Sequence, residues 1–285
     1  NCLVGSEMCI RDRDNTGKER TAVCCLSSLN IETYDEWKDD TMFIEDVMRF
    51  LDNVMSDFIN RAPDSFSNAK YSAARERSVG LGVMGLHSFF QQKNIPFGSV
   101  MSKVWNQKIF KHIQEKADQA SVKLAEERGS CPDAEEYGIK ERFSNKTAIA
   151  PTASISVICG GASPGIEPIA ANSYTHKTLS GSFNVRNKYL AKILEKHGKN
   201  DDETWSSITT NQGSVSHLDF LTDIEKDTFK TAFEIDQRWI VELGADRTPN
   251  ISQAQSINVF VPADIHKKDL HQIHFQAWKK GLKSL

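Results

Sequence analysis

The sequence has no run of eighteen apolar residues, so it contains no segment able to span a membrane as a helix. It has little net charge, because 35 lysines and arginines stand against 38 aspartates and glutamates, and it offers no basic surface for coating a nucleic acid. Its six cysteines form no C-x-x-C pair and no zinc-finger spacing, which argues against a disulfide scaffold and favours reduced thiols in a cytoplasm. What is present is a globular composition, 39% hydrophobic over 285 residues, enough for one large domain or two small ones.

Residues 3–12 differ in kind from the rest of the chain. They read LVGSEMCIRD, which resembles, residue for residue, one reading frame of the transposon-end adapter used to prepare sequencing libraries. We therefore interpret residues 1–13 as an adapter artefact, against the alternative of a native N-terminal strand, and assign the folded domain to residues 14–285. On this interpretation Cys2 and Cys9 carry no functional weight.

Periodicity predicts an α/β domain with parallel strand pairing, because strand patterns alternate with helical ones. Residues 21–31 (TAVCCLSSLNI) are small and apolar, as in a buried strand, and residues 146–158 (KTAIAPTASISVI) read as a strand running into a tight loop. Residues 256–261 alternate like a further strand. Apolar residues at three- and four-residue steps predict helices from residue 39 to 61, after Gly85, and over residues 99–128, 187–197, 224–243 and 263–282.

Two motifs are set aside. Residues 80–85 (GLGVMG) fit G-x-G-x-x-G, but no buried strand precedes them and no acid follows about twenty residues later, so we favour glycines that let a helix pack closely. His266, His271 and His274 lie on the last predicted helix, where no third convergent metal ligand accompanies the pair that shares a face. We interpret them as surface histidines and predict no metal site.

The adjacent cysteines Cys24 and Cys25 are the first candidate for chemistry. Neighbouring side chains on a strand diverge, so these two thiols are poorly placed to form a disulfide with each other. They are either two buried thiols or include one redox thiol whose partner lies elsewhere. Thiol chemistry by itself leaves both interpretations open, because reactivity depends on local pKa and exposure.

A small-residue turn is the second candidate. Its backbone N–H groups and hydroxyls are not covered by bulky side chains, which makes a cradle for an anion, better still if a helix begins there. The alternative is an ordinary strand-to-helix turn capped by Ser and Thr. The residues of this turn are Pro151, Thr152, Ala153, Ser154 and Ile155, followed by Ser156.

Six blocks in order resemble one family, the large (α) subunit of class I ribonucleoside-diphosphate reductase. The blocks are TAVCCLSSLN (21–30), RSVGLGVMGLHSFF (77–90), APTASIS (150–156), GIEP (165–168), QAQSINVFVPA (253–263) and AWKKGLKSL (277–285). The resemblance implies the second half of the family's ten-stranded α/β barrel, incomplete at both ends. It also implies reduction of ribonucleoside diphosphates to 2′-deoxyribonucleoside diphosphates by thiyl-radical chemistry with a redox cysteine pair.

The same resemblance implies roles for both candidates. Cys24 matches the family's redox cysteine in the A-V-C pattern, with its partner further upstream. Cys25 falls where the family needs no thiol, and alternation along a strand puts it on the other face. Pro151, Thr152, Ala153, Ser154 and Ile155 match the loop that binds the substrate's phosphates.

The resemblance also implies what lies outside the sequence given. The family's radical cysteine, in Asn-Leu-Cys-x-Glu, would stand where residues 1–13 are, and a Tyr-Tyr radical relay and a cysteine tail would follow Leu285. We therefore expect a fragment that is inactive by itself and binds no cofactor of its own, with ATP or dNTP effectors binding upstream regions. Expected partners are the small (β) subunit, which holds the radical and metal cofactor, a thioredoxin- or glutaredoxin-type reductant acting through the tail, and a second α subunit; nucleic acid and membrane are not expected. The alternative is a non-catalytic nucleotide-binding or structural half-barrel module.

Overall fold

The computed structural model describes residues 16–178 and 181–285. The adapter interpretation of residues 1–13, and with it Cys2 and Cys9, lies outside the described residues. The helices are α1 (Tyr34–Trp37), α2 (Phe43–Arg61), α3 (Ser67–Glu76), α4 (Leu86–Gln92), α5 (Val100–Arg128), α6 (Pro132–Glu135), α7 (Ile155–Ile158), α8 (Lys188–Lys196), α9 (Asp202–Thr210), α10 (Asp223–Thr228), α11 (Arg238–Arg247) and α12 (Lys267–Lys279).

A short parallel sheet forms the centre of the molecule. Strands β1 (Leu26–Asn30) and β2 (Gly80–Met84) pair in parallel, and two parallel bridges add the segments at 147–149 and around 255. The predicted parallel α/β pairing is therefore confirmed, although the described residues form no closed barrel. Because all four segments run in the same direction, their carboxyl ends lie at one edge of the sheet, which is where parallel α/β proteins place their sites.

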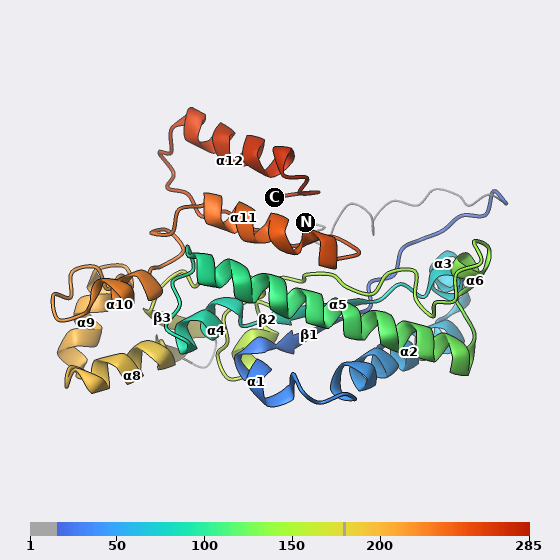
Figure 1. Ribbon diagram of the computed structural model, residues 1–285, viewed down its shortest axis with the longest axis horizontal. Helices are drawn as coiled ribbons and strands as arrows, with labels where there is room; N and C mark the ends of the chain where they lie inside the picture. The colour runs from blue at the N-terminus through green and yellow to red at the C-terminus, as the bar shows by residue number, and fades with distance from the viewer. Residues whose placement is uncertain (1–15, 179–180) are drawn as a thin grey trace.

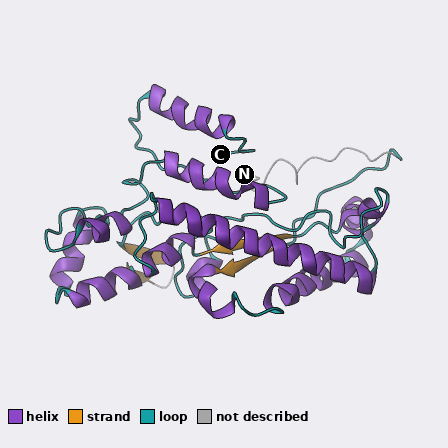
Figure 2. Ribbon diagram, in the orientation of Figure 1, coloured by secondary structure: helices purple, strands orange, loops and turns teal. Residues whose placement is uncertain are grey.

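Helix α5 is the longest element and runs along the length of the molecule (Figure 1). Ser99 caps its first turn by a reciprocal pair with Ser102, and Gly129 ends it with a positive φ, close to the predicted range of residues 99–128. Helices α2 and α11 both pack against α5, and α12 packs on α11 (Figure 2). One helix therefore supports both the sheet layer and the outer helical layer.

The main hydrophobic core lies between the sheet and α2, α4 and α5. Leu29, Leu81 and Val83 project from the strands, and Phe89 of α4 and Ile109 of α5 meet them; all five are at most 4% exposed. Burial of side chains of this size stabilises a fold by about 1.5–3 kcal/mol each. This core fixes the sheet and so positions its carboxyl edge.

A second core belongs to a separate part of the chain, which we call the small lobe (residues 172–178 and 181–229). It contains the antiparallel hairpin of β3 (Ser173–Thr178) and β4 (Gly181–Arg186) with α8, α9 and α10, at one end of the molecule (Figure 1). Tyr189, Leu194, Trp205, Ile208 and Phe229 are among its buried residues. The hairpin and α9 are absent from the sequence-based expectations above.

The single helix predicted over residues 224–243 is wrong. The structure has α10 and α11 there, separated by residues 229–237, and Phe233 between them is 60% exposed. The reason is a long-range contact: the Ala232 N–H donates to the carbonyl of Ile169, and the Gln237 side chain donates to the Ala232 carbonyl. Tertiary hydrogen bonds thus override the helical periodicity.

Three smaller expectations also need correction. Residues 256–261 form no strand, since only Gln255 bridges to the sheet. The apolar residues at three- and four-residue steps in α2 do not all face the core, because Phe50 and Val54 are exposed. The glycines of GLGVMG do permit close packing, but in strand β2 and not in a helix: a Cβ on Gly80 would collide with the Leu26 side chain.

The histidines of the last helix have a structural role at one position. His266 is the N-cap of α12, and its ring accepts a hydrogen bond from the Lys268 N–H. Among the described residues no group of three His, Cys, Asp or Glu side chains could hold a metal ion. No helix of the described chain is long and apolar enough to cross a membrane.

Candidate active site

Cys24 and Cys25 differ in exposure to solvent. Cys25 is 7% exposed, and its thiol lies 3.7 Å from the Leu51 carbonyl of α2, whereas Cys24 is exposed. The Gly80 N–H donates to the Cys25 carbonyl at 2.9 Å, so this segment already runs as an extended chain beside β2. Extended backbone alternates its side chains, which explains the split and excludes the interpretation of two buried thiols.

Burial raises the pKa of both thiols, and for Cys25 the neighbouring Cys24 raises it further. Each sulfur is therefore held as a neutral thiol near neutral pH, the form that can give up a hydrogen. Both cysteines line a cavity of about 280 Å³ whose other walls are Val23, Leu26 at the start of β1 and apolar residues of α2. Of the two cysteines, Cys24 is the one that both lines the cavity and is exposed to solvent.

The turn at residues 151–155 lies at the carboxyl edge of the sheet, directly after the segment at 147–149. Thr152 has a left-handed backbone, φ +54°, and its buried Oγ1 accepts a hydrogen bond of 2.7 Å from the Gly165 N–H. Ala153, Ser154 and Ile155 are exposed, and among the described residues no backbone group accepts from their N–H groups. Three adjacent donors therefore face solvent, as an anion cradle requires.

A helix does begin in this turn, but it is short. Helix α7 has four residues, so its dipole adds little to the attraction for an anion. The turn itself contains no Lys or Arg. Any phosphate affinity must therefore come mainly from the N–H groups and from how firmly the turn is held.

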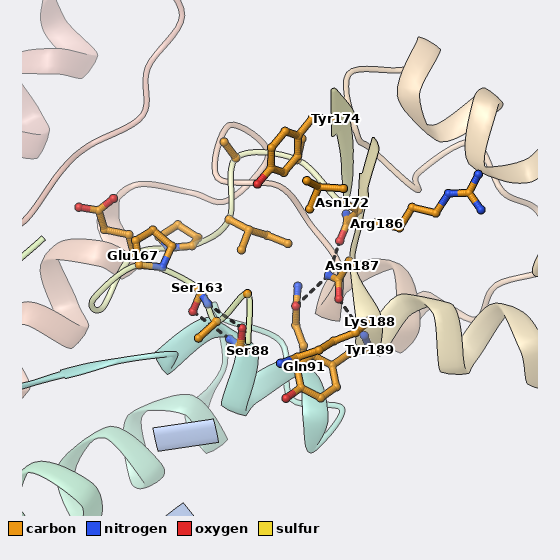
Figure 3. Close-up of a pocket in the computed structure, with 18 of the residues that line it drawn as sticks. Ser88, Gln91, Ser163, Glu167, Asn172, Tyr174, Arg186, Asn187, Lys188 and Tyr189 are labelled. Carbon is orange, nitrogen blue, oxygen red and sulfur yellow. Dashed lines mark hydrogen bonds between the residues drawn. The ribbon is translucent and has the colours of Figure 1, made fainter. Parts of the chain in front are cut away.

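A larger cavity, of about 520 Å³, lies between residues 160–172 and the small lobe (Figure 3). Its polar lining includes Ser88 and Gln91 of α4, with Asn187 at the start of α8. Burial raises the pKa of Glu167 in its wall, although a hydrogen bond from Asn258 opposes the rise. Neither Cys24 nor residues 151–155 line this cavity.

Sequence reasoning missed the residues around this cavity. Ser88, Gln91 and Asn187 come from segments about a hundred residues apart and have no spacing that marks a site. The available signals were three of the family blocks, since residues 77–90 contain Ser88, residues 165–168 contain Glu167 and residues 253–263 contain Phe260. The contacts that shape the cavity are set by tertiary packing of the small lobe.

Comparisons with known proteins agree on one family. The family described as "Ribonucleotide reductase, barrel domain" matches residues 4–141 and 132–285. The chain is 51% identical over 274 residues to the ribonucleoside-diphosphate reductase large subunit of Invertebrate iridescent virus 6, covering 95% of this chain and 28% of the viral protein. The corresponding large subunit of Danio rerio is 30% identical over 311 residues, covering 98% of this chain and 39% of that protein.

A solved structure is also similar. The class Id ribonucleotide reductase α subunit of Actinobacillus ureae superposes with a TM-score of 0.86 at 40% identity, covering 93% of this chain and 49% of that one. The chain belongs to the ribonucleotide reductase barrel-domain family. It spans between about a quarter and a half of the length of these relatives.

Proposed function

We propose that this chain provides part of the catalytic barrel of a ribonucleotide reductase large subunit, which reduces ribonucleoside diphosphates for DNA precursor synthesis. The fold would be the second half of the family's ten-stranded barrel, to which the four parallel segments contribute. The observation that carries the proposal is the exposed Cys24 beside the first strand, in a chain 51% identical to a reductase large subunit.

Cys24 would act as one of two redox thiols. Removal of the ribose 2′-hydroxyl as water takes two electrons and two protons from a thiol pair, which becomes a disulfide. Cys24 is a neutral, accessible thiol and suits this role. Cys25 does not, because its sulfur packs against the Leu51 carbonyl and α2.

Residues 151–155 would bind the substrate's diphosphate. The free N–H groups of Ala153, Ser154 and Ile155 are donors for phosphate oxygens, and the small side chains leave room for them. Thr152 would shape the turn, since its hydroxyl accepts from Gly165. Pro151 fixes the exit from the sheet through its restricted φ.

The remaining components would come from other chains or segments. The radical and its metal cofactor belong in this proposal to the small subunit, the regenerating electrons to a thioredoxin- or glutaredoxin-type protein, and ATP or dNTP effectors to segments upstream in a homodimeric large subunit. The sequence given contains neither the Asn-Leu-Cys-x-Glu motif nor the Tyr-Tyr relay. The polypeptide as written is therefore expected to show no turnover with a small subunit.

A chimera tests the proposal. Residues 14–285 replace the matching segment of the Invertebrate iridescent virus 6 large subunit, and reduction of cytidine diphosphate is measured with the viral small subunit and a dithiol reductant. We expect the chimera to turn over substrate. The Cys24→Ser variant of the chimera should still bind substrate but lose turnover. The matched control, Cys25→Ser, should retain turnover.

Turnover by the Cys24→Ser chimera would contradict the redox assignment. Inactivation by Cys25→Ser, in a chimera that still folds and binds substrate, would mean that the roles of the two cysteines are reversed. A folded chimera that binds nucleotide without turnover would instead favour the non-catalytic half-barrel module.

A further inference from the structure

The turn that is proposed to bind phosphate is held from the side of α4. Gly165 has φ +48° and lies so near the start of the turn that an added Cβ would be 3.0 Å from the Ala150 carbonyl oxygen. Its N–H donates to Thr152 Oγ1 at 2.7 Å, and its carbonyl accepts from the Leu86 N–H at 3.4 Å. The position of Gly165 therefore decides where the Thr152 hydroxyl sits.

Two buried serines fix the segment that carries Gly165. The Ser163 N–H donates to Ser88 Oγ at 2.9 Å, and the Ser88 N–H donates to Ser163 Oγ at 3.1 Å (Figure 3). The Gly85 N–H adds a bond of 2.8 Å to the Ser163 carbonyl. Both serines are at most 4% exposed, so water does not compete for these bonds.

The serine pair buries two hydroxyl groups, which close packing of these segments does not require. A reciprocal serine pair places two hydroxyls in a buried position where Ala would fit, and each hydroxyl must find a partner there. The two hydrogen bonds of the pair hold the start of α4 and residues 163–165 at a fixed distance from each other. One hydrogen bond, from the Gly165 N–H to Thr152 Oγ1, connects this fixed segment to the turn.

We propose that Ser88 and Ser163 are positioning residues for the phosphate turn. They set the orientation of the free N–H groups of Ala153, Ser154 and Ile155 by holding Gly165 against Thr152. The inference rests on the proposed function of this turn, and adds to it two residues that lie outside the turn.

The test uses the 285-residue chain and two separate measurements. Hydrogen exchange of the Ser156 and Cys159 amides, which bond within the turn to Thr152 and Ile155, reports on its rigidity. Calorimetric titration with inorganic pyrophosphate reports on anion binding. We expect Ser163→Ala and Ser88→Ala to speed exchange at both amides and weaken pyrophosphate binding, each roughly fivefold, as for loss of one hydrogen bond.

Ser121→Ala is the matched control. Its hydroxyl is equally buried and accepts from the Arg142 and Phe143 N–H groups, neither of which belongs to the turn. It should lower the melting temperature comparably and leave both measurements unchanged. Ser163→Thr keeps the hydroxyl and has room for a methyl in the adjoining cavity, so it should restore both values.

The outcomes distinguish the positioning role of the two serines from the phosphate-binding function of the turn. Unchanged exchange in Ser163→Ala, or faster exchange with unaltered pyrophosphate affinity, would overturn the positioning role while the turn still binds phosphate. Absence of pyrophosphate binding by the unaltered chain would contradict the proposed function of the turn, and the positioning role would fall with it. Failure of Ser163→Thr to restore either value would assign the effect to packing.

Discussion

Two buried polar networks in this molecule differ in charge. The first surrounds Asp52 of α2, which is fully buried and accepts from Arg77 at 2.6 Å, Arg142 at 2.9 Å and Arg128 at 2.7 Å. Burial opposes ionisation of Asp52, but the hydrogen bonds from Arg142 and Arg128, together with the positive charges of Arg77 and Arg142, lower the pKa of this carboxyl. This network ties α2 to the ends of α3 and α5, away from the carboxyl edge of the sheet.

The second network carries no formal charge and joins the small lobe to the main body. His87 Nδ1 accepts from the Ile169 N–H at 3.0 Å, and its ring also hydrogen-bonds the backbone of Thr228. Burial lowers the pKa of His87 to about 3, so the imidazole is neutral. Beside it, the Asn187 amide donates to Gln91 at 2.9 Å and to Asn172 at 2.8 Å.

The two networks differ in the free-energy cost of losing one hydrogen-bonding partner. Removal of a carboxylate from buried guanidinium groups leaves uncompensated charge, at a cost of about 3–5 kcal/mol. Loss of a neutral partner leaves an unsatisfied dipole, at about 1–3 kcal/mol. The charged network is therefore suited to a fixed scaffold, and the neutral one to the border of a cavity.

The largest expected effect is in the charged network. Asp52→Asn should lower the free energy of unfolding by about 3–5 kcal/mol, because three guanidinium groups lose their common anion. Urea unfolding followed by circular dichroism measures it. Asp57→Asn on the same helix is the control, since its pair with Arg61 is exposed and worth less than about 1 kcal/mol. Equal effects in the two variants would show that the buried charged network contributes no more than an exposed ion pair.

The neutral network should show itself in the pH dependence of stability. The pKa of His87 is lowered in the folded protein, so its contribution is complete above the unfolded value near 6.5 and is lost as pH falls toward about 3. At pH 4 this loss is on the order of 3 kcal/mol. His87→Asn keeps an acceptor for the Ile169 N–H but does not titrate.

The unaltered chain should therefore lose stability between pH 6.5 and 4 more steeply than His87→Asn in urea titrations. His112, whose pKa burial also lowers, contributes in both proteins and cancels in the comparison. Parallel pH profiles would show that the His87 ring is not held neutral. Asp52, whose pKa is lowered, is likewise present in both proteins and cancels in the comparison.

A third prediction concerns the attachment of the small lobe. The Tyr189 hydroxyl donates to buried Glu32 at 3.0 Å, while its ring packs in the core of the small lobe. Tyr189→Phe should cost about 2 kcal/mol, as for a hydrogen bond to a charged group, and should speed hydrogen exchange in α8 more than in α5. Tyr137→Phe, which is exposed, should change neither. Uniform loss of protection would mean that the lobe and body unfold as one unit.

The sequence was a good guide where local signals agree. Helix α5 has its caps at Ser99 and Gly129, and α8 has its cap at Asn187, so their bounds follow from short-range chemistry. The split between Cys24 and Cys25 follows from alternation on an extended chain. Each of these features needs only residues close together in the chain.

What sequence reasoning missed depends on distant partners. The break between α10 and α11 exists because Ala232 bonds to Ile169, and Arg77 adopts φ +42° to reach Asp52 of another helix. Neither contact leaves a periodic signal. The anion turn could be proposed from its small residues, but the serine pair that holds it joins positions 88 and 163.

The smallest expected effect is on pyrophosphate binding by the turn at residues 151–155. It distinguishes binding by the Ser154 side chain from binding by the backbone N–H groups. Ser154→Ala removes an exposed hydroxyl and leaves the N–H groups of Ala153, Ser154 and Ile155 in place. If those N–H groups carry the binding, pyrophosphate affinity should fall by less than about 1 kcal/mol, or roughly fivefold. This loss should not exceed that of Ser163→Ala, although Ser163 lies outside the turn. A tenfold or larger loss in Ser154→Ala would show that the hydroxyl carries the binding, and the orientation set through Gly165 and Thr152 would then matter less than the side chain itself.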